Sequence, residues 1–171
     1  MEVYLLRHGI AVEQGTEGYS EAERPLTPDG IEKMTRAARG IAELVPEFDL
    51  ILTSPLVRAR ETAQLAAEAT KSADSIKVAT GLLPGSAMRD TYALLQDHRA
   101  YRRVLLVGHE PHLSSFATYL LGGSSSVVEF KKGALCRIDI AATATRQPGL
   151  LIYHLPPKVL RALGGKHHHQ A

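Results

Sequence analysis

Two apolar runs of the sequence each lead into a histidine, and a third leads into a pair of arginines. Arg7 and His8 follow "VYLL", His109 follows "VLLVG", and Arg58 and Arg60 come soon after "LILTSP". An arginine guanidinium presents a fork of N–H donors that matches the oxygens of a phosphate. A neutral imidazole can attack phosphorus and hold the phosphoryl group covalently. Together, these residue types indicate phosphoryl chemistry.

The elements that must position these residues are strands that alternate with helices. The expected strands are Met1–Leu6, Phe48–Thr53, Ser75–Val78, Val104–Val107, Ala134–Ile140 and Leu150–His154, and the expected helices are 26–45, 54–70, 86–98 and 111–121. This alternation predicts an α/β fold, a three-layer α/β/α sandwich with a mostly parallel central sheet of about six strands. Ligands bind at the carboxyl ends of parallel strands, so the two histidines, Arg7 and one further arginine should converge there.

Local signals predict where the first two helices begin. Thr27 is expected to be an N-cap with Pro28 at the first helical position, and Ser54 and Pro55 are expected to play the same two roles later. Helical spacing predicts that the inward face of the first helix is formed by Ile31, Met34, Ala38, Ile41 and Leu44 or Val45.

The length and composition are those of an ordinary globular protein. Its 171 residues suit one domain, which we place at 1–163, followed by a flexible tail at 164–171 that contains His167–His169. The formal net charge of +2 gives no reason to expect a nucleic-acid partner. The one cysteine, Cys136, is expected to be a small core residue in a reducing compartment.

The sequence also carries expectations about location and cofactors. No apolar run approaches the roughly 20 residues of a membrane span, and the first residues lack the pattern of a signal peptide. We therefore expect a cytoplasmic protein that makes no membrane contact. We further expect a monomer without a metal site or a cofactor.

Each candidate residue also has a structural interpretation. A histidine at a strand end is commonly just hydrogen-bonded within the fold. Arg7 alone could be a surface cap, and Arg58 and Arg60 could form a solvated helix face. The coincidence of two histidines with an arginine at three strand exits, all predicted to be neighbours, favours a phosphate site instead.

The same motifs resemble the histidine phosphatase superfamily, which has the phosphoglycerate mutase-like fold. In order along nearly the whole chain they are "LLRHG", "RPLTPDG", "TSPLVRARETA" and "VGHEP". The resemblance implies that His8 is the phosphorylated nucleophile and that Arg7, Arg58 and His109 complete the phosphate pocket. Arg58 is preferred because the first arginine of the third motif is the family's pocket residue. Arg60 would lie about 200° away around the helix.

Physical chemistry adds roles to these residues. His8 must be unprotonated to attack, and two neighbouring arginines should lower its pKa. A backbone carbonyl that accepts from its other ring nitrogen would fix the tautomer. His109 is the better candidate to carry a proton, because charge develops on the phosphoryl oxygens. Gly9 is expected to let the backbone pass close to the phosphate, and Arg24 is expected near the rim of the pocket.

One departure from the family pattern bears on the substrate. Mutase and bisphosphatase branches carry a glutamate after the third strand that protonates the departing alkoxide. Here the corresponding segment holds Leu82, Leu83 and Pro84. A general acid typically contributes about 10²–10⁴-fold in rate, so an alkoxide would leave slowly without one. A phosphohistidine releases an imidazole, which is a far weaker base.

Two acidic residues could still serve as the general acid. Glu110 directly follows His109 at a helix start, where an acidic residue commonly compensates the helix dipole. Asp90 lies beside Arg89, which suits a surface position.

The missing glutamate and the compact chain resemble the SixA branch, phosphohistidine phosphatases that act on histidine-phosphotransfer domains. We therefore expect hydrolysis of protein phosphohistidine through a covalent phosphohistidine intermediate, with phosphate or sulfate as an active-site ligand. One alternative is a phosphatase of small phosphomonoesters with an unrecognised acid. Another is a non-catalytic phosphate-binding module. A mutase is disfavoured, because it needs the acid and a closed pocket.

Overall fold

The structure, a computed structural model, describes residues 1–126, 128–141 and 145–165 as an α/β fold. The six strands of its sheet are β1 (Glu2–Arg7), β2 (Leu50–Thr53), β3 (Ile76–Val78), β4 (Arg103–Gly108), β5 (Leu135–Asp139) and β6 (Leu150–Leu155). The α-helices are α1 (Pro28–Leu44), α2 (Val57–Ala69), α3 (Met88–Asp97), α4 (His112–Leu120) and α5 (Pro157–Leu163). Two short 3₁₀ turns, η1 (Ala73–Ser75) and η2 (Thr80–Leu82), flank β3.

The sheet is mixed, so the expectation of a mostly parallel sheet was only partly right. Its strand order is β3-β2-β4-β1-β5-β6. The pairings of β2 with β3, β2 with β4 and β1 with β4 are parallel, whereas β5 runs antiparallel to both β1 and β6. A parallel connection needs a crossover of a dozen or more residues, and the link between β5 and β6 is too short for one.

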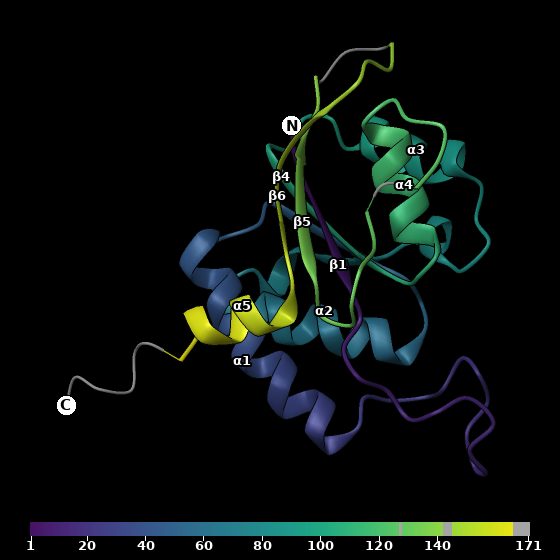
Figure 1. The fold of residues 1–171 in the computed structure, drawn as a ribbon, viewed down its shortest axis with the longest axis vertical. Coiled ribbons are helices and arrows are strands. Elements are labelled where there is room, and N and C mark those ends of the chain that lie inside the picture. Colours follow the sequence, from purple (N-terminus) through teal and green to yellow (C-terminus); the bar gives the residue numbers. More distant parts are fainter. Residues whose placement is uncertain (127, 142–144, 166–171) are drawn as a thin grey trace.

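Helices cover both faces of the sheet, which confirms the three-layer arrangement (Figure 1). Along β1, Val3 and Leu5 pack into a core with α3 and α4. The alternate residues Tyr4 and Leu6 pack into a second core with α1, α2 and α5. Because successive strand side chains point to opposite faces, this buried strand contributes to both cores.

The helix starts and the inward face of α1 differ in part from expectation. Thr27 does cap α1, and its Oγ1 accepts from the Gly30 N–H at 2.9 Å. Ser54 does not cap α2, which begins later at Val57. Of the predicted inward residues, Ile31 is 44% exposed, whereas Val45, the alternative to Leu44, is buried. Met34, Ala38 and Ile41 are buried as expected, and Gly30, Ala37 and Gly40 complete the buried face of α1.

Small residues form part of this face because α5 lies directly against it. A Cβ placed on Gly40 would lie 1.9 Å from the carbonyl oxygen of Leu160. Gly164 ends α5, and a Cβ there would lie 2.1 Å from the carbonyl oxygen of Arg36. Gly164 is therefore packed against the domain rather than part of a loose tail. Residues 166–171, which include His167–His169, lie outside the described residues.

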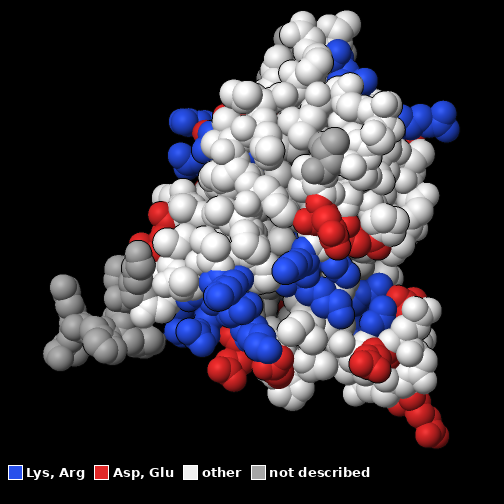
Figure 2. All heavy atoms as spheres, in the orientation of Figure 1, with Lys and Arg blue, Asp and Glu red and all other residues white. Residues whose placement is uncertain are grey.

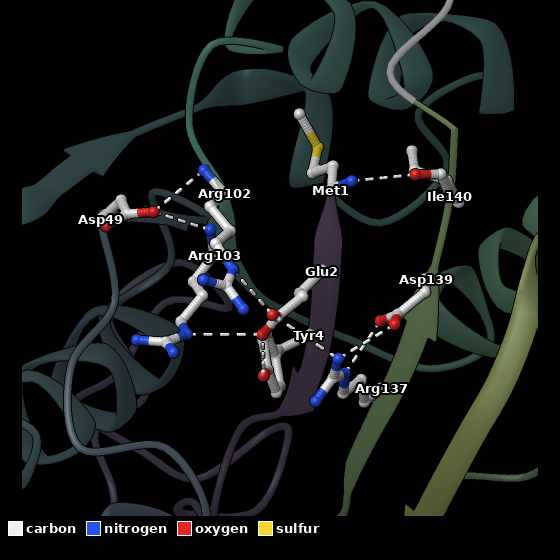
Figure 3. A network of polar contacts seen from close by, with 9 residues as sticks. All are labelled: Met1, Glu2, Tyr4, Asp49, Arg102, Arg103, Arg137, Asp139 and Ile140. Atoms are coloured by element: carbon white, nitrogen blue, oxygen red, sulfur yellow. Dashed lines mark hydrogen bonds and ion pairs between the residues drawn. The ribbon is translucent and has the colours of Figure 1, made fainter.

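A charged network ties the strands together at the end where β1 begins (Figure 3). The Glu2 carboxylate accepts hydrogen bonds from Tyr4 Oη at 2.7 Å and Arg102 Nε at 3.1 Å. It also forms ion pairs with Arg103 at 3.4 Å and Arg137 at 3.6 Å. The network thus links β1 to β4 and β5, and it leaves the opposite end of the sheet for other residues. Among the described residues, no helix is both long and apolar enough to cross a membrane.

Candidate active site

The carboxyl ends of β2, β4 and β1 lie side by side. Arg7 pairs in register with Gly108, and Thr53 pairs with Val107. An open cavity of about 410 Å³ lies at these ends. Its lining comprises Arg7, His8, Ala11, Glu13, Gln14, Glu21, Arg24, Arg58, Pro84, His109, Glu110 and Lys132. The structure therefore brings together all four residues that the motifs single out.

His8 is held in the tautomer that leaves one nitrogen free to attack. Its Nδ1 lies 2.7 Å from the carbonyl oxygen of Gly9. A carbonyl can only accept, so Nδ1 carries the hydrogen and Nε2 keeps its lone pair. Burial lowers the pKa of His8 to about 3, and the charges of Arg58 and Arg7 act in the same direction. The sequence predicted this direction, although burial rather than the arginines is the main cause.

This depressed pKa should make the fold sensitive to acid. Between the unfolded pKa of 6.5 and the folded value of about 3, the unfolded chain binds a proton that the folded chain does not. For this group, the free energy of unfolding should therefore be highest above pH 6.5 and should fall as the pH drops toward 3. The slope should approach about 1.4 kcal/mol per pH unit for this group. Urea unfolding of the wild type and of His8→Asn at pH 7.5, 6 and 5, in phosphate-free buffer, measures the effect. A difference in unfolding free energy between the wild type and His8→Asn that stays constant from pH 7.5 to pH 5 would contradict this prediction.

His109 is hydrogen-bonded on one ring nitrogen only. Its Nε2 lies 2.7 Å from Ser54 Oγ, which already accepts from the Leu56 N–H at 3.3 Å. Ser54 Oγ has one hydrogen and two lone pairs, so it can donate to His109 Nε2 or accept from it. Nδ1 is buried, and among the described residues it has no hydrogen-bond partner. His109 thus has one ring nitrogen whose hydrogen-bonding capacity is unused, in a residue that lines the cavity.

The protonation state of His109 differs from the sequence-based expectation. Burial lowers its pKa to about 3, with the charge of Arg58 as the next cause, so the ring is neutral rather than cationic. The His8 and His109 ring centroids are 5.2 Å apart. A phosphoryl dianion between them would favour the charged form of either ring. His109 is therefore neutral before the phosphate arrives.

The two arginines reach the cavity from different elements. Arg7 ends β1, and its Nη1 donates to the carbonyl oxygen of Phe130 at 2.7 Å. Arg58, on α2, is only 3% exposed. The Nε atoms of both are buried without a hydrogen-bond partner among the described residues. Arg60 is exposed and lines a different hollow, so Arg58 is the arginine of α2 that faces the cavity.

Glu21, which the sequence analysis did not select, contacts both Arg58 and Arg24. Its Oε1 accepts from Arg58 Nη2 at 2.8 Å and from Arg24 Nη2 at 2.7 Å. Its backbone oxygen accepts from Arg58 Nη1 at 2.9 Å. A loop carboxylate therefore occupies two donors that a phosphate would use. No periodic pattern marks such a residue, because its position depends on how a polar loop folds back.

Removing this charge should strengthen phosphate binding. The variant Glu21→Gln keeps the backbone contact to Arg58 but deletes a negative charge beside the phosphate position. A unit charge several ångströms away at the protein surface is worth about 1 kcal/mol. We expect the inhibition constant of inorganic phosphate to fall about threefold to tenfold. Glu23→Gln, in the same exposed loop, is the matched control. Weaker phosphate inhibition in Glu21→Gln would show that the carboxylate mainly orients the arginines.

Gly9 differs from its expected role, whereas Asp90 and Glu110 lie where their structural interpretations placed them. The Gly9 N–H donates to Thr62 Oγ1 at 3.0 Å, and a Cβ on Gly9 would point toward Leu26 at 3.3 Å rather than into the cavity. Gly9 therefore serves packing rather than close approach to phosphate. Asp90 is exposed, does not line the cavity, and its carboxylate lies 3.6 Å from Arg89. Glu110 does line the cavity.

Glu110 is already engaged at the start of α4. Its Oε1 accepts from the Ser114 N–H at 3.0 Å, and its other oxygen accepts from the Ser114 hydroxyl. Besides Glu110 and Glu21, the described residues contribute one more carboxylic acid to the lining, the exposed Glu13. The segment after β3 contributes Pro84. No group of three or more His, Cys, Asp or Glu among the described residues could hold a metal ion.

An imidazole with a free nitrogen, a second imidazole, Arg7 at the end of β1 and the buried Arg58 of α2 meet at one cavity, an arrangement suited to phosphoryl transfer. Residues 3–82 match the family described as "Histidine phosphatase superfamily (branch 1)". An uncharacterized protein of Picosynechococcus is 36% identical over 73% of this chain and 76% of its own length. The chain belongs to the histidine phosphatase superfamily, which supports phosphatase activity.

Two further comparisons connect the chain to SixA proteins. The phosphohistidine phosphatase SixA of Escherichia coli is 26% identical over 73% of this chain and 77% of its own length. The solved structure of the protein histidine phosphatase SixA with tungstate has a TM-score of 0.80 at 24% identity, and the match covers 94% of this chain and 99% of that one. The fold is shared more widely. The alpha-ribazole phosphatase of Shigella flexneri matches with a TM-score of 0.71 at 20% identity, over 92% of this chain and 97% of that one.

Proposed function

We propose that this protein hydrolyses phosphohistidine on a protein substrate, such as a histidine-phosphotransfer domain, in the cytoplasm. The observation that carries the proposal is the cavity itself. It pairs a nucleophile fixed in its attacking tautomer with two arginines, while two of its three carboxylates are held by other contacts. Such a site has the means to bind and accept a phosphoryl group. It has little means to protonate a poor leaving group.

The reaction would proceed in two displacements at phosphorus. His8 Nε2 forms a bond to phosphorus as the P–N bond of the substrate breaks. The departing imidazole keeps that electron pair and takes a proton from solvent. A water molecule then attacks the phosphohistidine, and its oxygen bonds to phosphorus as the bond to His8 breaks. Arg7, Arg58 and His109 would stabilise the charge on the phosphoryl oxygens in both steps.

An imidazole leaving group fits this cavity, because two of the acids that line it are engaged in other contacts. Glu110 is bonded to Ser114 at the start of α4, and Glu21 is bonded to two arginines. General acid catalysis is worth about 10²–10⁴-fold where the leaving group is a strong base. Imidazole does not need that contribution, whereas an alkoxide does. Similarity to SixA from Escherichia coli supports the same choice of substrate.

One observation favours a second candidate function. Glu13 lines the cavity, is exposed, and its carboxylate has no hydrogen bond or ion pair among those of the described residues. A carboxyl that is free to move could protonate an alkoxide. In that case the protein would be a phosphatase of small phosphomonoesters with Glu13 as its acid.

Amide substitutions at the candidate acids test the proposal. Glu13→Gln, Glu110→Gln and Asp90→Asn are assayed with a phosphohistidine peptide and with a phosphoserine peptide, which has an alkoxide leaving group. The wild type should prefer phosphohistidine, and each variant should keep its kcat/KM on that peptide within about threefold. Faster hydrolysis of phosphoserine, with a loss of about 10²–10⁴-fold in Glu13→Gln, would establish the ester phosphatase instead.

A further inference from the structure

A second hollow adjoins the active-site cavity through one residue, Lys132. Lys132 lines the active-site cavity and also a smaller cavity beside it. Lys33 of α1 and Arg161 of α5 line the smaller cavity as well. We call Lys33, Lys132 and Arg161 the basic rim. It extends positive charge from the phosphate site across the surface where α1 and α5 pack together.

Two of the three cations of the basic rim have no acidic partner among the described residues. Lys33 pairs with Asp29 at 2.8 Å. In the part of the chain that the structure describes, Lys132 and Arg161 form no ion pair. Figure 2 shows Lys and Arg side chains gathered over the lower half of this face, where Figure 1 places α1 and α5. This surface is therefore available to negative charge from another molecule.

The smaller cavity is too small to be a second phosphate pocket. Its volume is about 20 Å³. A cavity of that size holds roughly one water molecule. Its wall includes Gly9, Gly30 and Gly133. A Cβ on Gly30 would meet the Ile10 carbonyl oxygen at 2.0 Å, so this backbone is tightly packed. The rim cations can therefore act on a surface laid over them, but not on a small ligand enclosed beneath them.

We propose that the basic rim docks an acidic surface of the phosphorylated protein substrate beside the active-site cavity. The proposal rests on the proposed function, because a free phosphorylated metabolite would not extend to α5. Exposed charges at the edge of an interface mainly raise the association rate by steering the partner. Contact with Lys33 and Arg161 should thus assist only substrates large enough to cover both the cavity and the rim.

A pair of charge-reversed variants tests the docking surface. The rim variant carries Lys33→Glu with Arg161→Glu, neither of which lines the active-site cavity. The control carries Lys77→Glu with Arg99→Glu, two exposed residues on β3 and after α3, and makes the same change in net charge. Each protein is assayed on a phosphorylated histidine-phosphotransfer protein and on free phosphohistidine. The rim variant should lose about tenfold in kcat/KM at low salt on the protein substrate alone. Its salt dependence should flatten, and the control should match the wild type.

Other results would overturn the docking surface. Equal losses of kcat/KM in the rim variant and the control would show that the effect comes from net charge alone. An equal loss on free phosphohistidine would assign the rim to the phosphate site. If the rim variant is poorly folded by circular dichroism, Lys33→Gln with Arg161→Gln gives the same test with half the charge change. If the wild type hydrolyses free phosphohistidine but does not hydrolyse the phosphoprotein, the proposed substrate is refuted instead.

Discussion

The variant His8→Asn is expected to lose turnover by about 10⁴-fold or more, because it removes the atom that accepts the phosphoryl group. The wild type mixed with a radiolabelled phosphodonor should show a burst of protein labelling, with a bond that is labile to acid and stable to base. The variant should show no labelling. Asparagine is a reasonable replacement because its amide can still donate toward the Gly9 carbonyl oxygen.

His98→Asn is the matched control for this loss. His98 is also hydrogen-bonded to a backbone oxygen, that of Leu94, at 2.8 Å, and it does not line the cavity. Its replacement should leave both turnover and labelling unchanged. If the wild type shows no burst with any phosphodonor, the enzymatic interpretation fails. A non-catalytic phosphate-binding module would then be the better description.

The variant Gly40→Ala should lower the free energy of unfolding by about 1–3 kcal/mol, the usual range for overpacking. Alanine favours a helix interior over glycine by about 1 kcal/mol, so helix propensity alone predicts the opposite sign. The steric clash should outweigh the gain in helix propensity, because the added Cβ would lie 1.9 Å from the Leu160 carbonyl oxygen. Backbone cannot rotate away as a side chain can, so α5 must shift from α1.

Gly165→Ala separates this clash from a general effect of replacing glycine. A Cβ on Gly165 would approach its nearest neighbour, the Arg161 carbonyl oxygen, no closer than 3.4 Å. Urea unfolding should therefore show little change for Gly165→Ala beside a clear loss for Gly40→Ala. Stabilisation by Gly40→Ala would mean that α5 relaxes without cost.

The four central site residues could be found from sequence because each follows a strong local signal. Arg7, His8 and His109 come at the ends of apolar runs, and parallel strand ends meet at one edge of a sheet. Arg58 follows the third run by a few residues. The expectation that these strands are neighbours brought the residues together but left Arg58 and Arg60 open, and the resemblance to the family motif selected Arg58.

Ser54 and Glu21 lacked such a signal. Ser54 precedes a proline near a helix start, which is the local pattern of an N-cap, yet its hydroxyl contacts His109 more than fifty residues away. Glu21 lies in a polar loop without periodicity. Contacts of this kind depend on tertiary packing, which local propensity does not encode.

The direction of β5 and the exposure of Ile31 on α1 were missed for different reasons. Hydrophobic runs do not report strand direction, although the short link between β5 and β6 could have suggested an antiparallel pair. Ile31 has the spacing of a core residue and is nevertheless exposed. Close approach of α5 requires glycine at position 40 of the buried face of α1. Counting apolar side chains underestimates such small-residue contacts.

The Glu2 network at the start of β1 has a consequence for how this protein can change over time. It fixes β1 to β4 and β5 at one end of the sheet, while the reacting groups occupy the other end. Sites that share no partners usually contribute additively to stability. Substitutions that retune the cavity should thus leave the anchoring of the strands untouched. New substrate preferences can therefore evolve at one end without undermining the other.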